Sequence, residues 1–204
     1  MSSKGCRNGP DPETEHPTCP RPYSRAVAYW AEFITKASTS DPTLRETVLA
    51  ISAIPYGRPS ELSAEGVLRE WRGTCSTKHL LLLALIDQRW TNLRPTLLHR
   101  VYKLTKSKAL ETWGPEVAAS VPIQGLVDVH TYMTATISDQ ATTIDVTFPV
   151  DEWDGRSSMA VWAQSGEDVP AGSDPLGTKA DLVARWCDPA VREPFIAALA
   201  TRHL

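Results

Sequence analysis

The sequence predicts an α+β protein in which a central helix bearing a cysteine packs on an antiparallel β-sheet. A glycine and a threonine precede Cys75 and the leucine-rich segment 80–86 follows it, which indicates a buried helix that begins at the cysteine. Two segments rich in β-branched and aromatic residues, 127–137 and 142–148, flank a short polar stretch and indicate a β-hairpin. Helical patterns lie toward both ends of the chain, so further helices are expected around the sheet.

The length and composition fit one domain preceded by a tail. Residues 1–22 of the 204-residue chain combine many prolines with polar residues, and such a segment cannot bury enough apolar surface to order itself. We therefore expect a disordered or loosely docked tail at 1–22 and a single domain at 23–204. The formal net charge of −3 argues against a nucleic-acid partner.

The sequence contains no pattern typical of a membrane span or a secretion signal. A span needs about 18 or more apolar residues in a row, and the first residues carry no hydrophobic stretch of the signal-peptide kind. We expect a soluble, cytoplasmic protein without a membrane partner. The four cysteines are too few for a disulfide framework and are expected to be reduced thiols. In the tail, Cys6, His16 and Cys19 match no common zinc-site spacing.

The first part of the domain is expected to be helical. Apolar residues at three- and four-residue spacing predict a helix over 24–37 and a second over 40–53. A loop at 54–60, which contains two prolines and a glycine, ends the second helix. A short helix over 61–70 then leads into the glycine turn before the cysteine.

The cysteine helix is predicted to run from Cys75 to residue 88 or 89. Its leucines leave almost no polar face, so it should lie at the centre of the domain. The segment 97–104 predicts a strand. The segment 107–120 predicts a loop with one helical turn before Pro122.

The predicted hairpin brings two polar side chains within reach of each other. A turn centred on Ser138 and Asp139 places Asp145 opposite Tyr132 and diagonal to His130. Two unrelated polar residues on a half-exposed sheet would fit the same pattern. Beyond the hairpin, a stretch rich in Gly, Pro and Ser around 171–177 precedes two predicted helices, over 179–186 and 189–201.

A cysteine in the first turn of a helix is prepared for nucleophilic chemistry. Unpaired backbone N–H groups and the helix dipole favour its thiolate. Attack on a carbonyl also needs an imidazole that passes protons and a group that orients the imidazole. The chain supplies these three residue types in the order Cys75, His130, Asp145.

This order resembles the transglutaminase-like branch of the papain-like cysteine enzymes. The resemblance covers roughly residues 45–150 and rests on Ile-Pro-Tyr-Gly at 54–57, Leu-Arg-Glu-Trp-Arg-Gly-Thr-Cys at 68–75, Val-His at 129–130 and Ile-Asp-Val-Thr-Phe-Pro at 144–149. Many members of the family carry an aromatic residue after the cysteine and another after the histidine. This chain has Ser76 and Thr131 at those positions, so its acyl pocket should differ.

The resemblance implies a transglutaminase-like, papain-like core with flanking N- and C-terminal helices. It also implies a cysteine hydrolase or acyltransferase that forms a thioester with an amide, ester or thioester substrate. Cys75 would be the nucleophile, His130 the acid and base, and Asp145 the orienting group. The backbone N–H of Cys75 would bind the oxyanion. Trp71 and Tyr56 are candidates for a second donor or a wall of the acyl pocket, with packing at the loop as the alternative role.

The expected partners are a small-molecule or peptide acyl donor and, as acceptor, water or an amine. No cofactor and no metal are required by this scheme. A rival base is His79, which shares a helix face with Cys75. Zinc held by Cys75, His79, His130 and Asp145 is a further alternative, as is a non-catalytic binding module of the same family.

Overall fold

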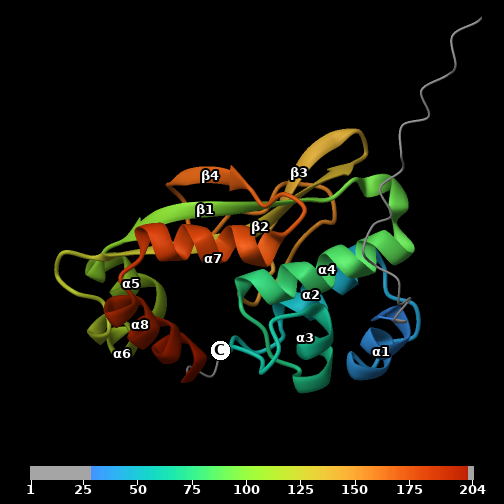
Figure 1. Ribbon diagram of the computed structural model, residues 1–204. Helices are drawn as coiled ribbons and strands as arrows, with labels where there is room; N and C mark the ends of the chain where they lie inside the picture. Colours follow the sequence, from blue (N-terminus) through green and yellow to red (C-terminus); the bar gives the residue numbers. More distant parts are fainter. Residues whose placement is uncertain (1–28, 202–204) are drawn as a thin grey trace, which may run out of the picture.

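The computed structural model describes residues 29–201, so the tail expected at 1–22 and the start of the domain lie outside this range. The described chain forms a four-stranded antiparallel sheet in the order β3-β2-β1-β4, with helices around it (Figure 1). The strands are β1 (Thr96–Leu104), β2 (Leu126–Ile137), β3 (Gln140–Ile144) and β4 (Glu167–Pro170). The predicted α+β class with an antiparallel sheet is confirmed.

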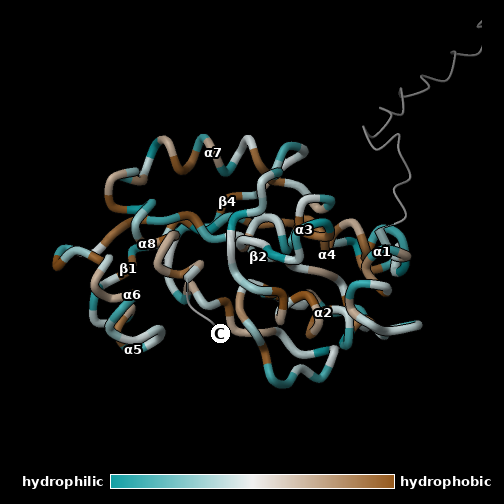
Figure 2. Tube along the Cα trace, turned by 90° about the horizontal axis from the view of Figure 1, so that it is seen from below, coloured by the Kyte–Doolittle hydropathy of each residue, from teal (hydrophilic) through white to brown (hydrophobic). Residues whose placement is uncertain are grey.

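The helices gather at the two ends of the sheet. Helices α1–α4 lie at one end and α5, α6 and α8 at the other, while α7 runs along β1 and β2 (Figure 1). Polar and apolar residues alternate along α7 in Figure 2, which is typical of a helix with one face on the protein and one in solvent. The helices are α1 (Tyr29–Lys36), α2 (Leu44–Ser52), α3 (Ala64–Glu70), α4 (Cys75–Arg89), α5 (Lys106–Trp113), α6 (Pro115–Ala119), α7 (Pro175–Trp186) and α8 (Pro189–Thr201), with a 3₁₀ turn η1 (Thr91–Leu93) after α4.

Helix α4 begins at Cys75 and is the central helix that the sequence predicts. Thr74 is its N-cap, with an extended backbone (φ −86°, ψ 175°), and the Thr74 N–H donates to Oγ1 of Thr77 at 2.9 Å. Only glycine fits at position 73, because a Cβ there would lie 2.7 Å from Cγ of Lys78. Farther along α4, four apolar side chains are fully buried: Leu81, Leu82, Leu85 and Ile86. Burial of each contributes about 1.5–3 kcal/mol.

The hairpin has the predicted turn and register. Ser138 and Asp139 have φ values of 50° and 63°, as in a two-residue turn that matches the twist of the strands. Ile137 pairs with Gln140 and, farther along, Met133 pairs with Ile144. The second arm is shorter than expected, because β3 ends at Ile144.

Asp145 therefore lies just beyond the sheet and not within it. Its Oδ1 accepts from the Thr147 N–H at 3.1 Å. The N–H of Val146, the residue after Asp145, donates to Nε2 of His79 on α4. These two bonds draw the backbone away from β2. The prediction of a strand through residue 148 is wrong for this reason.

Buried apolar side chains form two clusters that meet near the start of α4. The first joins α1–α4 to β2 and β3 and includes Phe33, Leu81 and Met133. The second includes Trp113 of α5, Phe195 of α8 and Tyr56. Tyr56 in turn forms a bridge pair with Gly73, close to the N-terminus of α4.

Three further segments differ from expectation. The segment expected as a loop with one helical turn holds α5 and α6, separated by Gly114 at φ 85°. Strand β4 is unexpected, and it pairs only with β1 at the sheet edge. Helix α7 starts at Pro175, inside the stretch rich in Gly, Pro and Ser, because the Asp174 side chain accepts from the Gly177 N–H and caps it. None of the helices described is long and apolar enough to cross a membrane.

Candidate active site

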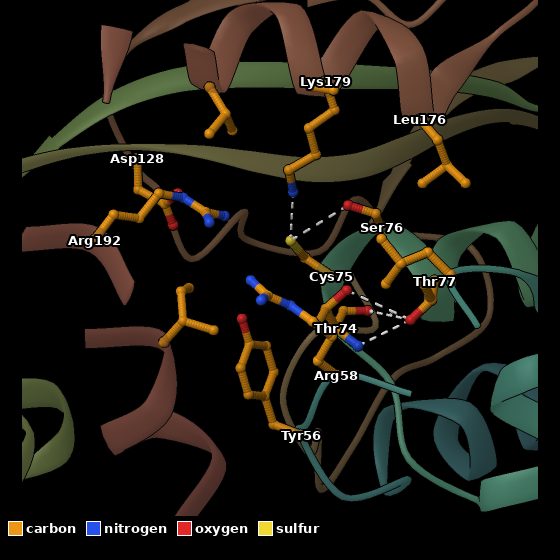
Figure 3. A pocket seen from close by; sticks show the side chains of 14 residues that line it. Tyr56, Arg58, Thr74, Cys75, Ser76, Thr77, Asp128, Leu176, Lys179 and Arg192 are labelled. Carbon is orange, nitrogen blue, oxygen red and sulfur yellow. Dashed lines mark hydrogen bonds and ion pairs between the residues drawn. The ribbon is translucent and has the colours of Figure 1, made fainter. Parts of the chain in front are cut away.

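Cys75 is the first residue of α4 and lies on the wall of a pocket. The side chain is 7% exposed, and the residue is one of 14 that line a cavity of about 260 Å³ (Figure 3). The N–H groups of a first helical turn have no partner within the helix, so they face whatever occupies this end of α4. The fold therefore presents the sulfur to a ligand at a helix N-terminus.

His130 and Asp145 form a buried hydrogen-bonded pair. His130 lies on β2, Asp145 follows β3, and Nε2 of the ring is 2.8 Å from Oδ2 of the carboxylate. Asp145 also accepts from two backbone N–H groups, those of Thr147 and Trp162, both at 3.1 Å. Burial alone would raise the pKa of Asp145, but His130 and these bonds hold it far below the usual range. The carboxylate is therefore ionised and fixed in place.

The His130 ring also lies close enough to Cys75 for its charge to favour the thiolate. Because Asp145 occupies Nε2, the nitrogen that can serve the sulfur is Nδ1, which also accepts from the Trp162 indole N–H at 3.0 Å. Burial would lower the pKa of His130, but the charge of Asp145, the bond to it and the nearby thiolate raise the pKa to about 9. A proton on the thiol can thus pass to a ring that holds it well at neutral pH.

The electrostatics of Cys75 favour its thiolate. Burial alone would raise the pKa of Cys75, but the charge of Lys179 and the proximity of His130 lower it to about 5. The Nζ of Lys179 is 3.0 Å from Sγ (Figure 3). The second described cysteine, Cys187, has the opposite shift, since burial raises its pKa to about 11.

Lys179 is a site residue that the sequence analysis did not single out. It follows Cys75 in the chain by 104 positions, outside the segment 45–150 on which the expected family resemblance rests. A signal was present, because Leu176, Lys179 and Val183 follow helical spacing on one face of α7. A lysine on an otherwise apolar face needs an acceptor. Because the helix was predicted to start at residue 179, Leu176 fell outside it and the pattern was not recognised.

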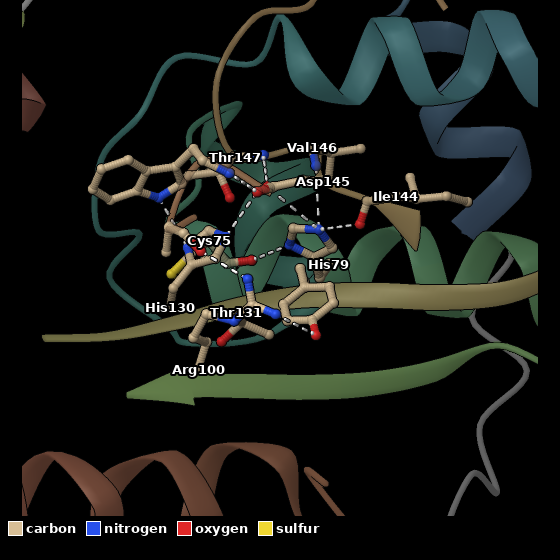
Figure 4. A network of polar contacts seen from close by, with 12 residues as sticks. Cys75, His79, Arg100, His130, Thr131, Ile144, Asp145, Val146 and Thr147 are labelled. Atoms are coloured by element: carbon tan, nitrogen blue, oxygen red, sulfur yellow. Dashed lines mark hydrogen bonds and ion pairs between the residues drawn. The ribbon is translucent and has the colours of Figure 1, made fainter. Parts of the chain in front are cut away.

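His79, the rival base, is held by the backbone. Its Nδ1 donates to the carbonyl of Cys75 at 2.7 Å, and its Nε2 accepts from the Val146 N–H at 3.2 Å (Figure 4). Burial lowers its pKa to about 4, so the ring is neutral. With both nitrogens engaged, His79 joins α4 to the end of β3 and has no nitrogen left for Sγ.

The four residues considered as a zinc set do not form one. Within residues 29–201, no three side chains of His, Cys, Asp or Glu are arranged to hold a metal ion. Both nitrogens of His79 are engaged by backbone groups, and Nε2 of His130 is bonded to Asp145 (Figure 4).

The structure places Tyr56 at the pocket and Trp71 away from it. Tyr56 lines the cavity and stacks on Phe148, with ring centroids 5.4 Å apart. Burial raises the pKa of Tyr56 well above its ordinary value, so its hydroxyl stays protonated and can donate. Trp71 packs on Phe33 in the first core cluster and is not one of the residues that line the cavity.

The pocket lining combines aliphatic, polar and charged side chains. Arg192 of α8 donates to Asp128 of β2 at 2.6 Å, and Tyr102 donates to the other carboxylate oxygen at 3.2 Å. Arg58 is at the rim, where it pairs with the half-exposed Glu193. The aliphatic part of the wall consists of Leu62, Leu176, Ala180, Val183 and Ile196.

Comparisons of the chain with protein families, with curated proteins and with solved structures find no match. The chemistry available at the site thus follows from its own side chains. A thiolate at the end of a helix faces a pocket, an imidazole lies beside it, and a buried carboxylate orients the imidazole. Such a set can transfer an acyl group through the sulfur.

Proposed function

We propose that this protein is a cysteine-dependent acyl-transfer enzyme of the transglutaminase-like, papain-like type. Cys75 is its nucleophile, His130 its acid and base, and Asp145 the group that orients His130. The observation that carries the proposal is the buried 2.8 Å hydrogen bond from His130 to Asp145, on a ring close enough to Cys75 to lower the pKa of its thiol. Three groups in this relation perform nucleophilic catalysis on unrelated folds.

The first half of the reaction forms a thioester. The Cys75 thiolate adds to the carbonyl carbon of an amide, ester or thioester, and the π electrons move to the carbonyl oxygen. When the tetrahedral intermediate collapses, the bond to the leaving group breaks, and Nδ1 of His130 gives that group its proton. The products are a Cys75 thioester, a neutral imidazole and the protonated leaving group.

The second half releases the acyl group. His130, now neutral, takes a proton from water or from an amine as that molecule attacks the thioester. Collapse of the second intermediate expels the Cys75 sulfur as a thiolate and restores the imidazolium. With water the reaction is hydrolysis, and with an amine it forms a new amide.

The pocket supports an acyl group with a small aliphatic body. Its volume of about 260 Å³ lies just below the usual range for drug-sized ligands, about 300–1,000 Å³. Aliphatic side chains from α7 and α8 form part of its lining. We therefore include a small-molecule or short peptide acyl donor in the proposal.

No cofactor takes part in this scheme. A thiolate nucleophile stays active where thiols remain reduced, so the proposal also places the enzyme in the cytoplasm. The net charge of −3 is consistent with a substrate that is neither nucleic acid nor membrane lipid.

Acylation by p-nitrophenyl esters tests the function. The protein is mixed with the acetyl, butyryl and hexanoyl esters, and its intact mass and labelled peptide are measured. The expected result is one acyl group on Cys75, lost in Cys75→Ala and at least a hundredfold slower in His130→Ala, since general acid–base catalysis contributes about 10²–10⁴.

Cys187→Ala is the matched control, because it removes the other described cysteine and should leave acylation unchanged. A second readout is the rate of iodoacetamide labelling at pH 7, with Cys75 compared between the native and the urea-unfolded protein. Faster labelling of native Cys75 is expected. Equal labelling, together with no acyl adduct from any ester, overturns the proposal and leaves the non-catalytic alternative.

A further inference from the structure

Lys179 has a contact that the three-residue scheme does not use. Its Nζ is 3.0 Å from Sγ of Cys75 and 3.2 Å from Oγ1 of Thr131, and the lysine is 8% exposed. None of the ion pairs in the described part of the chain joins Lys179 to a carboxylate. The buried ammonium therefore has the Cys75 sulfur as its negative partner.

The hydrogen bonds behind Lys179 have a defined direction. Nε2 of His99 lies 2.8 Å from the Pro175 carbonyl, which can only accept, so Nε2 carries the ring proton. His99 is neutral, because burial and the charge of Lys179 lower its pKa to about 4. Its bare Nδ1 then accepts from the Thr131 hydroxyl at 3.0 Å.

This direction leaves the oxygen of Thr131 as an acceptor for Lys179. The ammonium has three N–H bonds, of which one points to Thr131 and one to Sγ of Cys75. Pro175 and Lys179 belong to the same helix. The series of hydrogen bonds from the Pro175 carbonyl through His99 and Thr131 therefore holds α7 in place beside the Cys75 sulfur. The third N–H is left for a ligand.

Lys179 and Cys75 also line the same cavity. Leu176 and Ala180, on either side of Lys179 in α7, contribute to its aliphatic wall. A carbonyl group that reaches the sulfur from this cavity therefore passes beside the ammonium (Figure 3).

We propose that Lys179 is a fourth catalytic residue, which balances the charge of the Cys75 thiolate before attack and donates a hydrogen bond to the oxyanion after it. The proposal rests on the acyl-transfer function above. It assigns to Lys179 the role of second oxyanion donor, beside the backbone N–H of Cys75, for which Trp71 and Tyr56 were the expected candidates.

The negative charge moves only a short distance when the Cys75 thiolate attacks the carbonyl carbon. When Sγ bonds to the carbonyl carbon, the negative charge passes from sulfur to an oxygen two bonds away. A cation 3.0 Å from Sγ can bond to that oxygen by small rotations of its own side chain. His130 supplies the proton for the leaving group, so Lys179 keeps all its protons throughout and needs no regeneration.

The test compares Lys179→Met, which keeps the length and removes the charge, with Lys179→Arg, which keeps the charge. Two quantities are measured for each: the pH dependence of iodoacetamide labelling at Cys75, and kcat/KM for p-nitrophenyl butyrate. Arg185→Met, which removes an exposed cation from the same helix, is the control. Circular dichroism and urea midpoints report whether each variant is folded.

In Lys179→Met we expect the labelling profile of Cys75 to move to higher pH and kcat/KM to fall by about 10²–10³, the usual effect of losing one oxyanion donor. Lys179→Arg should recover most of the labelling profile and part of the rate. A residue with only a packing role would leave the labelling profile in place.

The outcomes separate the two proposals. If the wild type is acylated at Cys75 and folded Lys179→Met keeps both its rate and its profile, the role of Lys179 is wrong and the acyl-transfer function stands. If the wild type is not acylated at all, both are wrong. Should Lys179→Met not fold, Lys179→Gln, which also removes the charge, takes its place: a labelling profile shifted to higher pH supports the charge role, and an unchanged profile contradicts it.

Discussion

The indole Nε1 of Trp162 donates a hydrogen bond of 3.0 Å to Nδ1 of His130. Asp145 holds Nε2 of that ring, so Nδ1 is the nitrogen that must take the thiol proton of Cys75. A donor aimed at Nδ1 stabilises the neutral ring and competes with the imidazolium. Trp162 itself is held by Trp113, with ring centroids 4.5 Å apart, so the competing donor is firmly placed.

Replacement of Trp162 by phenylalanine should therefore shift the balance toward thiolate and imidazolium. The aromatic contact with Trp113 is kept in part, and the N–H is lost. We expect the apparent pKa of the Cys75 thiol to fall by roughly one unit, which corresponds to about 1.4 kcal/mol. The pH profile of iodoacetamide labelling measures the shift. A profile that moves to higher pH contradicts the assignment of Nδ1.

The pH dependence of kcat/KM should be bell-shaped. Below a pKa of about 5 the sulfur of Cys75 is protonated and cannot attack, and above a pKa of about 9 His130 has no proton for the leaving group. The rate with butyryl p-nitroanilide, whose amine leaving group needs a proton, should thus rise through the first value, level off and fall through the second. A single rising limb would show that His130 is not the acid.

Asp145→Asn should change the second limb specifically. The asparagine keeps an oxygen for the hydrogen bond but removes the charge that raises the pKa of His130. We expect the falling limb to move down toward about 6.5, the ordinary value for histidine. We also expect kcat to drop by about 10²–10⁴. If the limb stays in place while kcat falls, Asp145 acts by packing alone.

His79 should affect stability and not the catalytic pH profile. Its folded-state pKa of about 4 lies below its ordinary value of 6.5, so as the pH falls the unfolded chain binds the proton first. The stability due to neutral His79 is complete above about pH 6.5 and is lost toward pH 4, by about 3 kcal/mol in total.

The variant His79→Asn tests this, because its side-chain amide can still donate to the Cys75 carbonyl. Urea midpoints measured between pH 4 and pH 7 should depend less on pH in the variant than in the wild type. The remaining dependence comes from groups such as His99 and Asp145, whose pKa values are also lowered. An equal slope of the urea midpoint against pH in both proteins would show that folding does not lower the pKa of His79.

The length of the acyl chain that the pocket accepts should depend on the cavity wall formed by α7. Ala180→Leu adds bulk to the cavity, so we expect kcat/KM for the hexanoyl ester to fall at least tenfold and that for the acetyl ester to change little. Asp181→Leu, next to it on α7 and outside the cavity, is the control. Equal losses for both esters would place the acyl group elsewhere.

The sequence alone was sufficient for the local features of the fold. The start of α4 at Cys75 follows from the glycine and the N-cap Thr74 before it, and the hairpin register follows from the two residues of its turn. Such features depend on neighbours in the chain, whose conformational preferences are visible in one dimension. The juxtaposition of His130 and Asp145 followed in turn from the register.

The tertiary structure decided which of these groups face one another. It engaged both nitrogens of His79 with backbone groups, packed Trp71 into the core, and brought Lys179 within 3.0 Å of Cys75. No local pattern contains that contact, because α7 reaches the sulfur only by packing on β1 and β2. The sequence by itself determined the place of Cys75 at the start of its helix and the hairpin behind it, whereas long-range packing determined the charge beside the sulfur.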